Sequence, residues 1–149
     1  MSAALRLARP EDLDRLMGLV AGFHAEAGIE QDPDQRRAAL APLLEGIPHG
    51  CVYLIGPSRA PLGYVIITFG WSVEFGGMDG FVDEIYIRPA VRGRGIATEL
   101  LQALPKALAA GGLKALHLEV DRANETAQRL YLRAGFKPRD RYMLMSKAL

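Results

Sequence analysis

The sequence predicts a mixed α/β fold, which another naming places under α+β. Its 149 residues are half hydrophobic and 23% charged, a composition typical of a single globular domain spanning residues 1–149. Two strand–helix–strand crossovers are expected after residue 80, whereas hairpin patterns dominate before it. Together these patterns predict one mixed sheet with helices on both faces.

The N-terminal half is expected to contain two helices and a hairpin. Residues 5–9 alternate and predict a short strand, which Pro10 ends. The helices follow from Asp12 to Phe23 and from Pro33 to Glu45, with turn residues and acids between them. The runs CVYLIG and LGYVIITFGW flank the turn GPSRAP and predict a hairpin. A glycine-rich turn, FGGMDG, then leads into the strand FVDEIYI, which is stopped by Pro89.

The C-terminal half begins with a helix whose apolar stripe consists of Ile96, Leu100, Leu101, Leu104 and Leu108. Pro105 lies inside this helix and is expected to kink or locally break it. The run ALHLEV predicts a buried strand, and NETAQRLYLRA predicts a helix that Gly135 ends. The run YMLMSKAL predicts a final strand.

Charge and apolar patterning argue against several classes of function. The formal net charge is +1 at pH 7, which argues against nucleic acid as a partner. The apolar runs are shorter than the roughly 18 residues of a membrane span, and the N-terminus lacks a secretory signal pattern. The single cysteine, Cys51, suits a cytoplasmic protein, and three scattered histidines form no metal-ligand pattern. We therefore expect a cytoplasmic protein with no membrane association and no bound metal.

The segment RGRGIA, residues 92–97, stands where the chain is expected to pass from a strand into a helix. The first turn of a helix leaves about four backbone donors unpaired, and the helix dipole adds partial positive charge. Phosphate groups bind such turns, and glycine lets them approach the main chain. The spacing fits neither a Walker loop nor a dinucleotide-binding fingerprint. From these residues alone, a phosphate site and a tight turn without a ligand are equal alternatives.

Two motifs resemble those of the GNAT N-acetyltransferase superfamily, and in particular its small single-domain members of bacterial type. The first is R-x-x-G-x-A, from Arg92 through Gly95 to Ala97, after EIYIRPAV. The second is N-x-x-A-x-x-L-Y-x-x-x-G-F, which NETAQRLYLRAGF at 124–136 matches at each stated position. The resemblance covers about residues 82–136. It implies a mostly antiparallel sheet with a splayed parallel strand pair, an acceptor-side half at 1–80 and an acetyl-CoA-binding half at 81–149.

The resemblance also implies an acyltransferase that moves an acetyl group from acetyl-CoA, its co-substrate, to a primary amine of a small molecule or peptide. The amine would attack the thioester directly in a ternary complex. By family likeness, the pantetheine arm would pair with the strand end as an added strand, and the pyrophosphate would lie on the glycine loop. The corresponding residues are Ile85, Tyr86 and Ile87 for the arm, and Arg92, Gly93, Arg94, Gly95, Ile96, Ala97 and Thr98 for the pyrophosphate. Asn124 is a candidate cofactor contact, and a helix N-cap is its alternative role.

Three side chains are the main candidates for proton transfer. Tyr131 matches the family tyrosine that returns a proton to the CoA thiolate, and a packed aromatic residue is the alternative. Asp83 and Glu84 are candidate bases, although neighbours on a strand face opposite sides unless a bulge intervenes. The diamine-acetylating branch of the family has Glu-Asp here, and the shorter first acid of this chain favours a water relay over direct abstraction. Glu119 is a further candidate, for which an exposed carboxylate at a strand end is the preferred interpretation.

Family likeness assigns the acceptor to the segments FHAEAGIEQDPDQ and WSVEFGGMDG. Their acids and aromatic residues suit a cationic amine such as a polyamine, an amino sugar or a lysine-like side chain, and solvated loop acids are the alternative. These residues are Glu26, Glu30, Asp32, Asp34, Glu74 and Asp79, with Trp71, Phe75 and Met78. Trp71 and Phe75 are equally interpretable as core residues or as homodimer contacts.

Two other classes of function are consistent with the motifs. One is a non-catalytic module that binds CoA as a sensor or scaffold. That function is expected if Tyr131 is buried away from the thioester and neither Asp83 nor Glu84 faces the pocket. The other is a toxin that acetylates aminoacyl-tRNA, against which the near-zero net charge argues. The N-acetyltransferase is the function that we predict.

Overall fold

Five strands form one sheet, in chain order, in this computed structural model, which describes residues 4–149. The strands are β1 (Leu5–Leu7), β2 (Gly50–Ile55), β3 (Gly63–Ser72), β4 (Gly77–Ile87) and β5 (Ala115–Leu118). Strands β1 to β4 pair antiparallel with their neighbours, whereas β4 and β5 pair parallel. The predicted sheet, mostly antiparallel with one parallel pair, is therefore confirmed. The sheet lies in the first of two compact units, Met1–Glu119 and Val120–Leu149.

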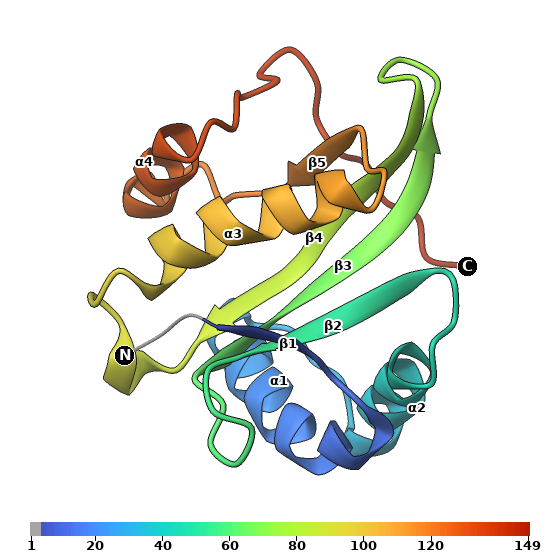
Figure 1. Cartoon of the computed structure of the whole chain (residues 1–149), viewed down its shortest axis with the longest axis vertical. Coiled ribbons are helices and arrows are strands. Elements are labelled where there is room, and N and C mark those ends of the chain that lie inside the picture. Colours follow the sequence, from blue (N-terminus) through green and yellow to red (C-terminus); the bar gives the residue numbers. More distant parts are fainter. Residues whose placement is uncertain (1–3) are drawn as a thin grey trace. The chain divides into compact units, whose positions relative to one another are not determined.

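Helices cover both faces of this sheet, as predicted (Figure 1). On one face, α1 (Leu13–Ala27) and α2 (Pro33–Leu44) pack through Leu16, Val20 and Leu40. On the other face, α3 (Ile96–Ala110) packs through its predicted apolar stripe. Strand β3 serves both cores because its side chains alternate: Tyr64 and Ile66 belong to the first cluster, Val65 and Ile67 to the second.

Local polar contacts explain where the first two helices begin. A 3-10 turn, Pro10–Asp12, precedes α1, and Arg6 of β1 donates to both carboxylate oxygens of the buried Asp12 at 2.9 and 3.0 Å. At α2, Asp32 and Gln35 form a capping box, with the Asp32 side chain accepting from the Gln35 amide at 2.9 Å.

No helix of residues 4–149 has the length and apolar character that crossing a membrane requires.

Three boundaries differ from the sequence-based prediction. Helix α3 runs unbroken through Pro105, because Leu100, Leu104 and Leu108 on either side of the proline are buried against the sheet. Strand β4 begins at Gly77 rather than Phe81, since Met78, Asp79 and Gly80 pair with β3. Helix α1 continues to Ala27, beyond its predicted end at Phe23.

The second unit, Val120–Leu149, contains the helix α4 (Glu125–Arg133). Asn124 caps this helix, and its side-chain oxygen accepts a hydrogen bond from the Ala127 amide at 3.0 Å. The predicted final strand at 142–149 is wrong, because residues 120–149 contain no strand. A strand requires a partner edge, and this unit offers none of its own.

The close approach of β3 and β4 at Gly63 leads to a stability prediction. Gly63 pairs with Ile87, and a Cβ at Gly63 would overlap the main-chain oxygen of Tyr86. We expect Gly63→Ala to lower the free energy of unfolding by about 1–3 kcal/mol, because the paired backbone cannot move aside.

Gly18→Ala is the matched control, since Gly18 lies in α1 and a Cβ there would meet none of the described atoms within 4 Å. This change should raise the free energy of unfolding by about 0.5–1 kcal/mol, through helix propensity alone. Chemical denaturation measures both variants. Equal stability of the two would contradict the strand geometry at Gly63.

Candidate functional site

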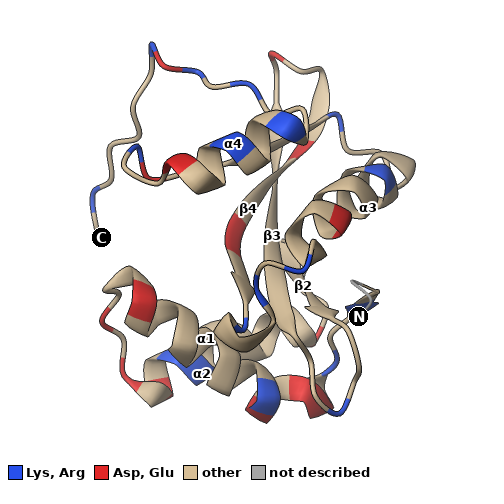
Figure 2. Ribbon diagram, turned by 90° about the vertical axis from the view of Figure 1, so that its left-hand side faces the viewer, with Lys and Arg blue, Asp and Glu red and all other residues tan. Residues whose placement is uncertain are grey.

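A β-bulge at Asp83 brings two carboxylates to one face of the sheet. Ile66 of β3 pairs with Glu84 of β4, whereas the next residue, Ile67, pairs with Val82, so Asp83 has no partner in the ladder. The extra residue interrupts the alternation of side chains, and Asp83 and Glu84 both line one cavity. Figure 2 shows acidic residues as a red band part of the way along β4.

Glu84 is held by two buried donors. The Tyr64 hydroxyl donates to its Oε1 at 2.7 Å, and the His24 ring Nε2 lies 2.8 Å from its Oε2. Tyr64 is fully buried and His24 is 5% exposed. Burial, and then the charge of Glu84, raise the pKa of Tyr64, so its hydroxyl stays protonated and donates. Glu84 is thus fixed in orientation as an acceptor.

Asp83 differs from its neighbour in having no hydrogen bond to its carboxylate from any residue of the described range 4–149. Its side chain is exposed to solvent. Even so, the partial burial of the carboxyl raises its pKa, and the charges of Glu84 and Glu119 raise it further, against an opposing effect of His24. Asp83 is therefore a carboxylate with an unused acceptor and an increased affinity for a proton, as a general base requires.

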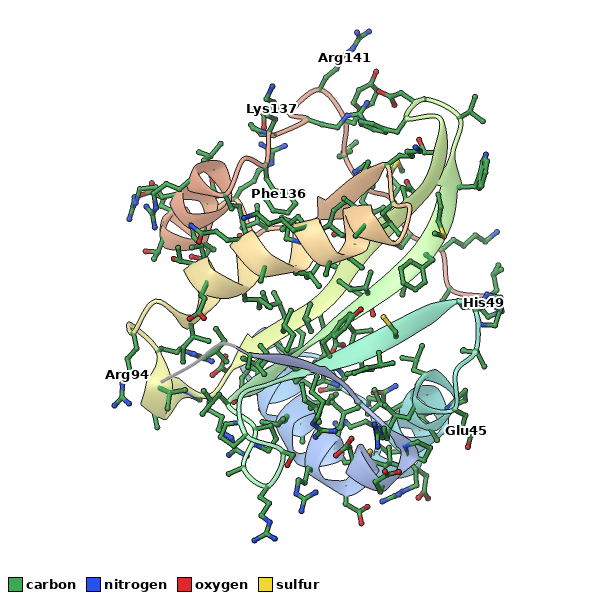
Figure 3. The ribbon with its side chains drawn as sticks, in the orientation of Figure 1. Glu45, His49, Arg94, Phe136, Lys137 and Arg141 are labelled. Atoms are coloured by element: carbon green, nitrogen blue, oxygen red, sulfur yellow. The ribbon has the colours of Figure 1, made fainter. Side chains whose placement is uncertain are left out.

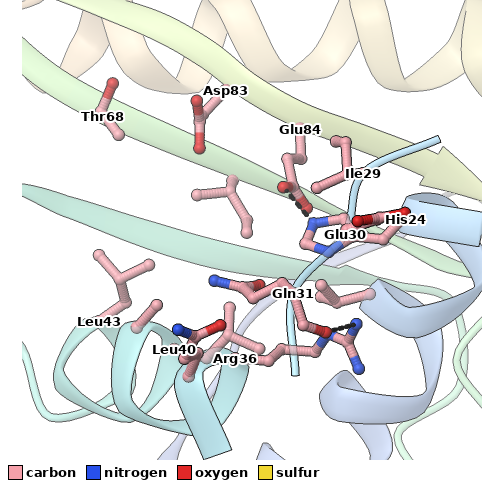
Figure 4. A pocket seen from close by; sticks show the side chains of 14 residues that line it. His24, Ile29, Glu30, Gln31, Arg36, Leu40, Leu43, Thr68, Asp83 and Glu84 are labelled. Atoms are coloured by element: carbon pink, nitrogen blue, oxygen red, sulfur yellow. Dashed lines mark hydrogen bonds and ion pairs between the residues drawn. The ribbon is translucent and has the colours of Figure 1, made fainter. Parts of the chain in front are cut away.

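The cavity that holds these acids has a volume of about 620 Å³ (Figure 4). Its walls come from α1, α2 and the loop between them on one side, and from β3 and β4 on the other. The apolar walls are Val20, Ile29, Ala39, Leu40, Leu43 and Ile66, and the polar lining is His24, Glu30, Gln31, Gln35, Arg36, Thr68, Asp83 and Glu84. A volume of this size holds a small ligand or the end of a peptide.

Some of the loop acids that the sequence suggested for the acceptor have other roles. Glu30 lines the cavity, whereas Asp32 caps α2 and Asp79 lies 3.0 Å from the His117 ring nitrogen Nε2. Trp71 is 77% exposed, which rules out the core interpretation for this side chain. Counting the acidic residues of the two segments therefore overestimates the negative charge of the cavity, which only Glu30 of them lines.

Several lining residues were not foreseen from the sequence. His24 is polar but continues the buried stripe of Leu16 and Val20 at a spacing of four residues, and such a histidine in an apolar stripe signals a buried partner. Arg36 lies in the first turns of α2, and its side chain lines the cavity. No local pattern distinguishes it from the neighbouring Arg37, which is exposed and pairs with Asp14 at 3.0 Å.

The edge of β4 next to the carboxylates is open toward β5. Parallel pairing of β4 with β5 ends at Val82 and Leu118, whereas β4 continues to Ile87. The main-chain groups of residues 83–87 on that side are therefore left without a neighbouring strand among the described residues. An extended chain of another molecule could pair there, which is how peptides add to sheet edges.

The glycine segment leads from β4 into α3 with two residues in the left-handed region. Gly93 and Gly95 both have φ of 78°, which favours glycine at each position. A Cβ at either glycine would meet none of the described atoms within 4 Å, so the space outside the loop is open. Gly95 is the N-cap of α3 and provides no capping side chain, which leaves first-turn amides available to an anion.

The two arginines of this segment differ in their surroundings. Arg92 donates to both carboxylate oxygens of Glu26 on α1 at 2.8 and 2.9 Å, and its Nε donates to the Ile87 carbonyl at 2.8 Å. Its guanidinium also lies over the Tyr86 ring, 5.5 Å from the centroid. Arg94 points away from the sheet (Figure 3). The side chain of Arg92 thus binds groups within the protein, and main-chain amides are the donors of this loop that are available to a phosphate.

In the unit Val120–Leu149, Asn124 has the capping role that was one of its two interpretations. Tyr131 packs edge-on against Phe136, with ring centroids 6.0 Å apart. Both residues belong to the second predicted motif. Within residues 4–149, no three histidine, cysteine or acidic side chains gather in a way that could hold a metal ion.

Comparison with known proteins agrees with this geometry. The chain matches the acetyltransferase (GNAT) family over residues 5–136. It is 35% identical over 71 residues to the uncharacterized N-acetyltransferase YycN of Bacillus subtilis (strain 168), a match that spans 48% of this chain and 44% of that protein. The chain thus covers less than half the length of this curated relative.

Solved structures extend the likeness to nearly the whole chain. The integron cassette protein HFX_CASS3, from the mobile metagenome of Cole Harbour Salt Marsh, is 33% identical, with a TM-score of 0.83 and coverage of 97% of this chain and 90% of that one. An acetyltransferase of Clostridium acetobutylicum, solved with acetyl-CoA, shares the fold at 18% identity, with a TM-score of 0.76 and coverage of 96% and 95%. The chain therefore belongs to the acetyltransferase (GNAT) family.

Proposed function

We propose that this enzyme transfers the acetyl group of acetyl-CoA to a primary amine of a small molecule or peptide, by direct attack in a ternary complex. The observation that carries the proposal is the position of Asp83. This carboxylate lines the cavity, has a raised pKa, and directly follows the last β4 residue that pairs with β5. A base at position 83 would lie next to an amine bound in the cavity and next to a thioester bound along the unpaired edge of β4.

The proposed chemistry needs two proton transfers. Asp83 takes the proton that the amine loses, directly or through a water molecule, as the amine nitrogen bonds to the acetyl carbon. The bond between that carbon and sulfur then breaks, and Tyr131 gives its proton to the leaving thiolate. Glu84 serves in this scheme as a fixed charge beside Asp83, because its two oxygens are already engaged by Tyr64 and His24.

The residues of this chain fit the donor substrate in two respects. The open space outside Gly93 and Gly95, and the uncapped first turn of α3, suit a pyrophosphate. Main-chain groups of Ile85, Tyr86 and Ile87 belong to the stretch of β4 that β5 leaves unpaired, which suits the amide-rich pantetheine arm. Asn124 is assigned in this scheme to helix capping rather than to cofactor contact.

The alternative functions have less support. A CoA-binding module without chemistry would not need two carboxylates in the cavity, one of them with a raised pKa. Action on aminoacyl-tRNA would require a basic surface for phosphate contacts, and the net charge is only +1. Along α1 and α2, acidic and basic segments are mixed (Figure 2). An amine screen read by release of free thiol from acetyl-CoA tests the proposal, and no thiol release with any amine would reject it.

The loop is tested by exchanging Gly95 for two side chains of nearly equal shape. Asparagine tolerates a left-handed φ and is neutral, whereas aspartate adds a negative charge next to the proposed pyrophosphate site. Gly95→Asp should bind acetyl-CoA about tenfold or more weakly than Gly95→Asn, because only the former repels the phosphates. Isothermal calorimetry gives both affinities. Equal binding by the two variants would remove the pyrophosphate from this loop.

The base is tested by Asp83→Asn, which should lower kcat/KM by about 10²–10⁴-fold. The parent enzyme should lose activity as the pH falls through the raised pKa of Asp83, since the protonated carboxyl cannot accept the amine proton. The variant should lack this acidic limb of the pH–rate profile. Glu119→Gln is the control, because Glu119 does not line the cavity. This variant should keep the acidic limb, displaced toward lower pH, since the charge of Glu119 contributes to the raised pKa of Asp83.

Stability separates loss of the base from loss of the fold. Because the pKa of Asp83 is raised in the folded state, ionisation of this group favours the unfolded state as the pH rises through the unfolded and then the folded pKa. Asp83→Asn removes this effect and should be at least as stable as the parent at neutral pH. A parental pH–rate profile in a folded Asp83→Asn protein would exclude Asp83 as the base.

The general acid is tested by Tyr131→Phe, which removes the hydroxyl and keeps the ring that packs on Phe136. We expect kcat to fall by about 10²–10⁴-fold with acetyl-CoA affinity nearly unchanged. Single-turnover kinetics is the appropriate measurement, because slow product release could hide a change in chemistry. A fall of less than about threefold in the chemical step would exclude Tyr131 from the mechanism.

A further inference from the structure

The lining of the cavity contains one basic side chain in addition to its acidic ones. Arg36 is the single lysine or arginine among the described residues that line it, together with the carboxylates of Glu30, Asp83 and Glu84. It extends from α2, on the side of the cavity away from β4, and Figure 4 shows Asp83 and Arg36 on opposite sides of the enclosed space. The one guanidinium of the lining therefore lies across the cavity from Asp83.

The guanidinium of Arg36 has few partners of its own. Its Nη2 donates to the Gln31 carbonyl at 3.1 Å, its Nε is buried without a partner, and it forms no ion pair with any carboxylate of residues 4–149. Three other arginines near these helices are paired with carboxylates. Arg6 binds Asp12, Arg37 binds Asp14, and Arg92 binds Glu26, each within 3.0 Å. A half-buried guanidinium with most of its donors unused is a site for a planar anion, and a carboxylate fits it in two-point fashion.

We propose that the acceptor is an amino carboxylate, whose amine lies toward Asp83 and whose carboxylate is bound by Arg36. The inference rests on the proposed acetyl transfer and narrows its substrate class. Opposite charges on the two walls match a zwitterion and disfavour a polyamine, which would bring a second cation to Arg36. The apolar side chains between the walls, among them Leu40, Leu43 and Ile66, provide room for an aliphatic or aromatic body.

The test compares acceptors that differ only in the presence of the carboxylate. Leucine and phenylalanine, and ω-amino carboxylates of increasing length, are each paired with their own carboxamide. The value of kcat/KM is measured by thiol release at saturating acetyl-CoA and expressed per concentration of neutral amine, since the carboxylate changes the pKa of the amine. We expect at least one carboxylate to exceed its amide by about tenfold or more.

Variants then assign that preference to a residue. Arg36→Gln should abolish the preference by slowing the carboxylate and leaving the amide nearly unchanged, and Arg36→Lys should restore part of it. Arg37→Gln, the neighbour on the exposed side of the same helix, should keep the parental ratio. A merely structural Arg36 would slow both members of a pair equally, so the ratio separates binding from folding.

Three results would overturn the inference. One is that the amides are acetylated as well as the carboxylates throughout the panel, which would leave amine acetylation itself intact. Another is that a preference for the carboxylate persists in a folded Arg36→Gln enzyme, which would assign anion binding to another group. Failure of every carboxylate, with turnover of simple amines, would equally reject the amino carboxylate and retain the acyltransferase.

Discussion

The unpaired residue Asp83 is the constraint on which the arrangement of this enzyme depends. A bulge adds one residue to β4 and none to β3, so the side chains before and after it exchange faces. Val82 then packs under α3, while Glu84 meets α1. Parallel pairing with β5 ends at the same level. One local irregularity thus connects the two cores, the pair of acids and the open strand edge.

The two acids have different environments although they are adjacent in sequence. Glu84 is surrounded by donors, Tyr64 from β3 and His24 from α1, which fix the orientation of its carboxylate. Asp83 has no such donors, and burial, followed by the charges of Glu84 and Glu119, raises the pKa of its carboxyl. The two adjacent carboxylates can have different roles because only Glu84 is hydrogen-bonded by buried side chains.

Much of the fold could be predicted because its signals are local. The β2–β3 hairpin, the apolar stripe of α3 and the cap at Asn124 each depend on residues within a few positions of one another. The strand expected at 142–149 failed because a strand needs a distant partner, which an apolar run does not specify. The bulge could be named only as an alternative, since β3 and β4 must be paired before an extra residue can be counted.

The sequence predicted the acidic residues of the site but not most of the residues that surround them. Asp83, Glu84 and the glycine loop stand within motifs that can be recognised in the sequence. His24 and Glu84 are 60 residues apart, and only the packing of α1 on the sheet brings them together. Arg36 and Arg37 look alike in the sequence, and the direction of α2 decides which of them reaches the cavity. The roles of Tyr131 and of the loop residues remain predictions.

The ion pair between Arg92 and Glu26 connects the glycine loop to the last turn of α1, next to the segment that forms one wall of the cavity. The pair therefore links a charge of the glycine loop to a charge at the cavity end of α1. If a phosphate draws Arg92 toward itself, Glu26 loses its counterion, and the end of α1 becomes more acidic by one uncompensated charge. Thermodynamic reciprocity then requires that any molecule favouring the separated pair on the cavity side also strengthens phosphate binding at the loop. If the proposed ternary complex forms, binding of each substrate would thus affect binding of the other through this salt bridge, more strongly at low ionic strength than at high.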